Sequence, residues 1–104
     1  MDQSTAFRIA EQYTEKVKKV FQPESIVLFG SYARGDFREG SDIDVAIVFQ
    51  EFDGDYLDTM IRLGKLRDGI SYEIEPHVLV KNDDRSGFAK HVMKTGHILY
   101  QAAA

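Results

Sequence analysis

The sequence predicts an α/β fold (α+β in layout), in which a small mixed β-sheet is flanked by helices. Short apolar runs typical of strands alternate along the chain with segments of helical periodicity. The 104 residues, 43% of them hydrophobic, are enough for one compact core. The chain has no cysteine, so neither disulfides nor Cys-ligated metals can stabilise it. We therefore expect residues 1–104 to form a single domain.

The first half of the chain predicts one helix and two strands. Apolar residues recur at helical spacing from about Ser4 to Phe21, and Pro23 ends that pattern. The apolar run from Ile26 to Phe29 stops at Gly30 and predicts a short buried strand. Residues alternate between two faces from Ile43 to Phe49, which predicts a second strand.

The second half predicts two more helices around a third strand. A helical stripe runs from Tyr56 to Arg67, and Tyr72 to Val80 has strand character. Pro76 within this strand indicates an edge or a bulge, because proline has no amide hydrogen to donate to a neighbouring strand. Phe88 to Lys94 is predicted as the last helix, and residues 98–100 are expected to pack back on the core.

The charge and hydropathy of the chain exclude several classes of function. With 13 basic and 17 acidic residues the net charge is −4, which argues against extensive contact with nucleic acid. No apolar run approaches the roughly 20 residues of a membrane span. The amino-terminal residues lack the basic and apolar regions of a secretion signal. We expect a cytoplasmic protein without membrane contact.

The segment from Gly30 to Asp44 combines two requirements of phosphate chemistry. Gly30 follows a strand and opens a helical turn, so backbone N–H groups there can face an anion beside the Ser31 hydroxyl. Asp42 and Asp44 are two residues apart, which places both carboxylates on one face of a strand. Oxygen ligands of this kind suit Mg²⁺, which is usually bound by one or two carboxylates and by substrate phosphates.

The third strand supplies a possible third carboxylate. Glu73, Glu75 and His77 share one face of this strand, and Glu75 is the better candidate because Glu73 lies at the solvent-exposed start. In sites with two metal ions a shared third carboxylate helps to hold the ions and can accept the proton of the nucleophile. His77 is expected beside the site and not as a ligand, and His91 and His97 are expected at the surface.

These motifs resemble a known superfamily. Gly30-Ser31, then ten residues, then Asp42-Ile43-Asp44 is similar to the Gly-Ser-x10-Asp-x-Asp motif of the DNA polymerase beta nucleotidyltransferases. The segments 30–35 and 41–44 resemble in particular the minimal nucleotidyltransferase (MNT) proteins of prokaryotes, and residues 74–77 resemble the strand of their third acid. The resemblance covers about residues 21–100. The chain departs from it at Glu75, where an aspartate is commoner.

The resemblance implies a fold and a reaction. The fold would be the polymerase beta-like nucleotidyltransferase fold, with Gly30, Ser31 and Arg34 on the triphosphate of ATP. Asp42, Asp44 and Glu75 would be the catalytic acids and would hold Mg²⁺, with two ions expected. MNT proteins are commonly encoded beside a helical HEPN-domain toxin. They act as antitoxins by transferring AMP from ATP to a tyrosine of that toxin.

Simpler roles remain open for each residue of the predicted site. Gly30 and Ser31 could form an ordinary turn with a helix cap, and Asp42 could belong to a turn before the strand. Glu75 could be an edge-strand charge that blocks unwanted pairing. Arg34 could pair with Asp36 on the surface. Asp44 is harder to explain without a cation, because a charge within an apolar strand is costly to bury alone.

Other functions also remain open. The chain could bind ATP without catalysis and neutralise its partner by contact alone. It could also transfer AMP to a small molecule. Nuclease or phosphatase chemistry is disfavoured, because neither needs a Gly-Ser phosphate turn at this distance from the acids.

Overall fold

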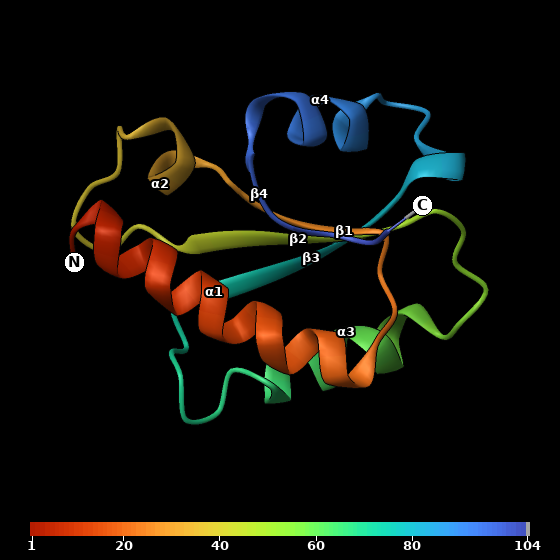
Figure 1. Ribbon diagram of the computed structural model, residues 1–104, viewed down its shortest axis with the longest axis horizontal. Coiled ribbons are helices and arrows are strands. Elements are labelled where there is room, and N and C mark those ends of the chain that lie inside the picture. Colours follow the sequence, from red (N-terminus) through yellow and green to blue (C-terminus); the bar gives the residue numbers. More distant parts are fainter. Residues whose placement is uncertain (104) are drawn as a thin grey trace.

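A computed structural model describes residues 1–103 and shows a four-stranded mixed sheet with the strand order β3-β2-β1-β4 (Figure 1). In chain order the elements are α1 (Gln3–Val20), β1 (Ser25–Phe29), α2 (Ser31–Arg34), β2 (Ile43–Phe49), α3 (Tyr56–Lys65), β3 (Ile74–Val80), the 3-10 helix η1 (Lys81–Asp83), α4 (Phe88–Thr95) and β4 (His97–Gln101). Strand β1 pairs antiparallel with β2 and β4, and β2 pairs in parallel with β3. The predicted fold class, a small mixed sheet with helices on it, is confirmed.

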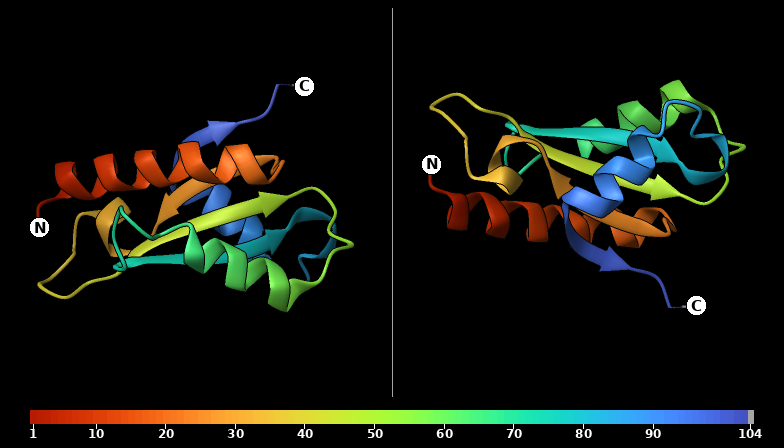
Figure 2. Two further views of the ribbon diagram at one scale, coloured as in Figure 1. Left: turned by 90° about the horizontal axis from the view of Figure 1, so that it is seen from below. Right: turned by 90° about the horizontal axis from the view of Figure 1, so that it is seen from above.

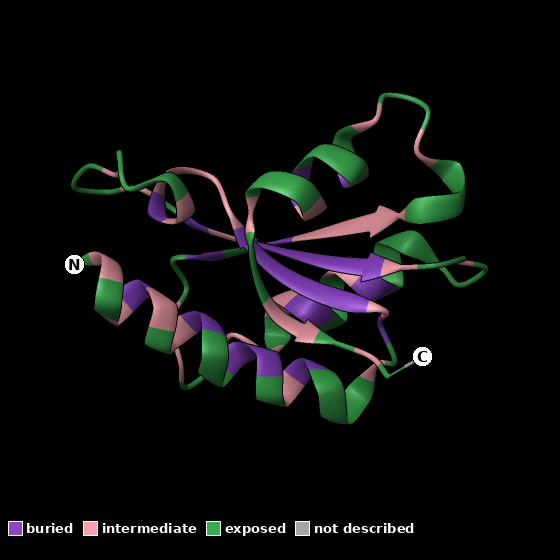
Figure 3. Cartoon of the chain, turned by 45° about the horizontal axis from the view of Figure 1, so that its top comes forward, coloured by how far each residue is buried: buried purple, intermediate pink, exposed green. Residues whose placement is uncertain are grey.

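The helices cover both faces of the sheet. Helices α1 and α3 lie on one face and α4 lies on the other, whereas the short α2 lies at the end of the sheet beside the start of α1 (Figures 1 and 2). Side chains along β2 point alternately to the two faces of the sheet. Ile43, Val45 and Ile47 belong to the core under α1. On the other face, Ala46 and Val48 pack with Val92 of α4. Burial is concentrated in β1 and β2, and the outer surfaces of the helices are exposed (Figure 3).

Helix α1 follows the predicted pattern closely. It starts at Gln3 because the Asp2 side chain accepts a hydrogen bond from the Thr5 N–H at 2.8 Å, which caps the first turn. The Tyr13 hydroxyl donates to the carbonyl of Leu63 at 2.6 Å and so ties α1 to α3. The buried side of α1 is formed by Ala6, Ala10, Tyr13, Thr14 and Val17.

The end of the chain differs from the prediction. Residues 97–101 form a full edge strand, β4, whereas the sequence indicated only apolar contact with the core. A Cβ on Gly96 would lie 2.9 Å from the Leu28 carbonyl oxygen, so a glycine is needed for the chain to pass this close to β1. Pairing over such a long sequence separation leaves no local signal in the sequence.

Of the two explanations for Pro76, a sheet edge or a bulge, the structure shows the edge. Pro76 lies in β3, which is at the opposite edge of the sheet from β4 and pairs with β2 alone among residues 1–103. Strand β3 begins at Ile74 and α3 ends at Lys65, each two residues inside the predicted bounds. Within the described residues, no helix combines the length and the apolar character that crossing a membrane requires.

Candidate functional site

The turn between β1 and α2 depends on Gly30. Its backbone has φ 77° and ψ −155°, a conformation that is essentially restricted to glycine. A Cβ at this position would also overlap the Oδ2 atom of Asp44. Gly30 therefore lets the turn lie directly against the Asp44 carboxylate of the neighbouring strand, and a side chain here would displace it.

Helix α2 has only four residues and is held in place by tertiary contacts. Tyr32 is 2% exposed and stacks on Phe37 at 4.6 Å, and Gln3 of α1 donates to the Tyr32 carbonyl at 2.6 Å. These contacts fix the direction of the short helix relative to the sheet.

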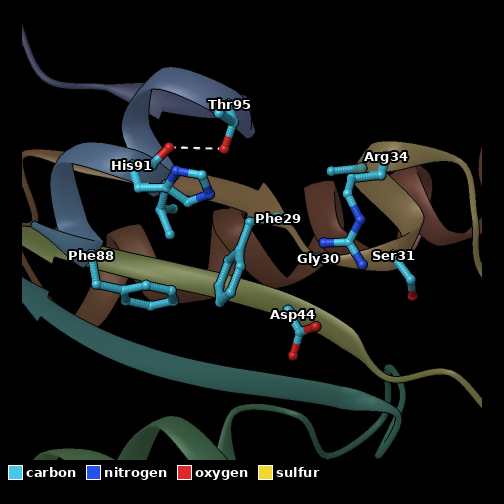
Figure 4. Close-up of a pocket in the computed structure, with 10 residues that line it drawn as sticks. Phe29, Gly30, Ser31, Arg34, Asp44, Phe88, His91 and Thr95 are labelled. Carbon is cyan, nitrogen blue, oxygen red and sulfur yellow. Dashed lines mark hydrogen bonds between the residues drawn. The ribbon is translucent and has the colours of Figure 1, made fainter.

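The first turn of α2 leaves backbone donors for a ligand. The N–H groups of Ala33 and Arg34 both donate to the Gly30 carbonyl, at 3.1 and 3.0 Å. The preceding N–H groups, of Ser31 and Tyr32, come too early in the helix to find such an acceptor. The Arg34 guanidinium pairs with Asp36 at 3.3 Å and extends beside Gly30 into a cavity (Figure 4).

The parallel pairing of β2 and β3 brings the predicted acids together. Asp44 and Glu75 are register partners, so their side chains emerge on the same face of the sheet. Carboxylate oxygens of these two residues and a ring nitrogen of His77 all lie within 4.8 Å of one another. Asp42 is outside this group of three, but its carboxyl is near enough to raise the pKa of Glu75.

This concentration of negative charge affects Glu75. The Asp42 carboxyl and partial burial raise the pKa of Glu75 above its ordinary value, and the Asp44 charge acts in the same direction, while His77 opposes them. Carboxylates this close repel one another unless a proton or a cation lies between them. Because the donors are mostly carboxylate oxygens, the residues present fit a hard divalent cation such as Mg²⁺.

His77 lies closer to the acids than expected. Its Nε2 atom is 3.2 Å from Oδ1 of Asp44 and 3.9 Å from Oε1 of Glu75. Its ring packs edge-on against Phe29 with a centroid distance of 5.0 Å. The two-residue spacing from Glu75 already placed His77 on this face, but only the register of β2 and β3 puts it against Asp44.

A cavity of about 510 Å³ opens between α2 and α4. The predicted residues Gly30, Ser31, Arg34 and Asp44 form one end of it, whereas Asp42 and Glu75 are outside its lining. The other end is formed by a face of α4 that the sequence analysis missed: Phe88, His91, Val92 and Thr95 (Figure 4). The signal was available, because these four residues follow the i, i+3, i+4, i+7 spacing of one helical face.

We predict that Gly30→Ala lowers the free energy of unfolding by about 1–3 kcal/mol through backbone strain and also displaces the Asp44 carboxylate. Urea denaturation measures the first effect, and loss of the Mg²⁺-induced rise in melting temperature measures the second. Gly69→Ala is the matched control, because Gly69 also has a positive φ, of 80°, but has open space around it. If the two variants respond equally to Mg²⁺, the contact between Gly30 and Asp44 has no role in cation binding.

Comparisons with known proteins agree with this geometry. Residues 11–103 match the family model described as polymerase beta, nucleotidyltransferase. A candidate protein adenylyltransferase of Methanocaldococcus jannaschii is 34% identical over 94 residues, which cover 88% of this chain and 87% of the relative. The protein adenylyltransferase MntA of Thermococcus cleftensis is 28% identical over 88 residues, covering 83% and 84% of the two chains.

Two solved structures share the fold. A candidate nucleotidyltransferase of Sulfolobus solfataricus superposes with a TM-score of 0.71 at 27% identity, covering 95% of this chain and 83% of that one. A toxin–antitoxin structure with AMP-PNP gives a TM-score of 0.66 at 21% identity, covering 88% and 73%. Since the family match spans the glycine turn, all three acids and both walls of the cavity, the chain belongs to the polymerase beta nucleotidyltransferase family.

Proposed function

We propose that this protein is a Mg²⁺-dependent adenylyltransferase that transfers AMP from ATP to a tyrosine hydroxyl of a helical HEPN-type toxin and so acts as its antitoxin. The main observation in support is the register of β2 and β3, which sets Glu75 opposite Asp44 beside the Gly30 turn. Relatives named as protein adenylyltransferases support the choice of a protein acceptor. The fold shared with a toxin–antitoxin structure is consistent with such a partner.

Different residues of the site would bind the phosphates and the metal of Mg-ATP. The backbone of Gly30 and Ser31 and the Arg34 guanidinium would bind the β- and γ-phosphates. Asp42, Asp44 and Glu75 would hold the metal. When bound, Mg²⁺ would neutralise the charge that develops on the α-phosphate and on the leaving pyrophosphate.

The proposed reaction is an in-line displacement at the α-phosphorus. A bond forms between the acceptor oxygen and the α-phosphorus, and the bond from this phosphorus to the oxygen bridging to the β-phosphate breaks. Pyrophosphate leaves with the electron pair of that bond, and AMP stays on the acceptor. The hydroxyl proton passes to the Glu75 carboxylate, which would act as the general base.

The exposure of the acids favours a large acceptor. The Glu75 side chain is 53% exposed, so the described part of the chain does not by itself shield the reaction from water. A docked protein would close this face and orient the hydroxyl. The net charge of −4 favours a partner with a basic surface, and attraction of this kind weakens as salt is added.

We expect the purified chain with Mg²⁺ and ATP labelled at the α-phosphate to label the protein encoded by the adjacent gene. ATP labelled at the γ-phosphate should leave no label, because that phosphate departs with pyrophosphate. Replacing the acceptor tyrosine by phenylalanine should abolish labelling, and increasing salt should slow it. Free tyrosine and short RNA should be poor acceptors.

Two outcomes would replace this proposal. Neutralisation of the partner without any label would favour an antitoxin that acts by binding alone. Efficient labelling of a small-molecule alcohol without labelling of any protein would make the chain a small-molecule adenylyltransferase.

A further inference from the structure

We propose that the inner face of α4 forms the nucleobase half of the nucleotide site, with Phe88 stacking on the base. This inference rests on the proposed use of ATP and adds the residues that would recognise its base. It starts from the cavity between α2 and α4, whose volume of about 510 Å³ is within the usual range for small-molecule sites.

The two ends of the cavity differ in chemistry. At the α2 end, polar groups of Ser31, Arg34 and Asp44 suit phosphates. At the α4 end the lining is aromatic, with Phe29 of β1 and Phe88 and His91 of α4 (Figure 4). A nucleoside triphosphate has the same division, because a flat aromatic base is joined through the sugar to a chain of charged phosphates.

The aromatic side chains form a connected row that leads away from the acids. Phe29 packs edge-on against His77 at 5.0 Å and edge-on against Phe88 at 5.8 Å, with interplanar angles of 67° and 80°. His77 in turn contacts Asp44. The row therefore begins at the carboxylates that would lie at the α-phosphate and ends at Phe88, which is the direction in which the sugar and base would extend.

Packing of α4 on the sheet covers only one side of the Phe88 ring. The helix is anchored by Ala89 and Val92, which are 2% and 1% exposed. Phe88 itself is 43% exposed and lies at the rim of the cavity. Its ring is thus held by Phe29 on one side and retains exposed surface on which a base can stack.

The test compares binding of Mg-ATP with binding of magnesium tripolyphosphate, which has the phosphates but no base. Calorimetric titration should show that Phe88→Ala weakens ATP binding about five- to one-hundredfold, as expected for the loss of one stacked base. Binding of tripolyphosphate should not change. Phe88→Tyr should retain ATP affinity, because it keeps the ring, whereas Phe88→Leu should lose it.

Leu57→Ala is the matched control. Leu57 is also large, apolar and exposed, at 68%, but lies on α3 across the sheet, so both ligands should bind this variant normally. Equal ATP affinity in wild type and Phe88→Ala would overturn the inference and leave the proposed function standing. Equal weakening of ATP and tripolyphosphate would also overturn it, because Phe88 would then support the whole site. Failure of the wild type to bind ATP would overturn both proposals.

Discussion

Replacing both Asp42 and Asp44 by Asn is expected to reduce AMP transfer by several orders of magnitude while leaving the fold intact. Asparagine keeps the size of the side chain but removes the anionic oxygens that a hard cation requires. Without Mg²⁺ the variant should be at least as stable as the wild type, because repulsion among the clustered carboxylates is relieved. Transfer of labelled AMP measures the first effect, and thermal unfolding measures the second.

The same variant also tests Mg²⁺ binding directly, without measuring AMP transfer. Mg²⁺ should raise the melting temperature of the wild type, because a ligand that binds only the folded state stabilises it, and should have no effect on the variant. Asp83→Asn is the control, since Asp83 is 71% exposed and pairs with exposed Arg85. Transfer at the wild-type rate by the double variant would exclude the two aspartates as metal ligands.

Replacing Glu75 by Gln is expected to lower kcat about a hundredfold or more and to change the KM for ATP little. The value of kcat should fall because loss of a general base typically slows the chemical step by a factor of this size. The KM for ATP should change little because the proposed phosphate contacts are made by Gly30, Ser31 and Arg34. Steady-state kinetics with separate variation of ATP and acceptor would distinguish kcat from KM.

The pH dependence of stability should change in the same variant. The pKa of Glu75 is raised in the folded protein, so the stabilisation from its protonated form is present at low pH and is lost as pH rises through that raised pKa. Glu75→Gln should remove this loss and, without Mg²⁺, be at least as stable as the wild type near neutral pH.

Glu73→Gln provides the matched comparison for the catalytic role. Glu73 is exposed just before β3 and lies outside the cluster of Asp44, Glu75 and His77. The Glu73→Gln variant should therefore keep the kcat of the wild type. Unchanged turnover in Glu75→Gln would return Glu75 to the role of an edge-strand charge and leave the base unassigned.

The sequence alone determined the secondary structure of most of the chain. Periodicity predicted α1, β1, β2, α3, β3 and α4 to within about two residues at most ends, because apolar spacing and the positions of glycine and proline are local properties. Pro76 also indicated a sheet edge or a bulge in β3, and the structure shows the edge. The spacing of Gly30, Ser31, Asp42 and Asp44 predicted a phosphate and cation site, because those residues lie within one short segment. The family was inferred from the resemblance of this segment to a known motif.

Only the tertiary structure decided how distant segments meet. The parallel register of β2 and β3 sets Glu75 opposite Asp44 and brings His77 within 3.2 Å of Asp44, contacts that no local pattern encodes. The strand β4 and the aromatic end of the cavity on α4 were likewise absent from the predictions. Helical spacing places Phe88, His91, Val92 and Thr95 on one face of α4, but only the packing of α4 against distant segments shows that this face lines a cavity.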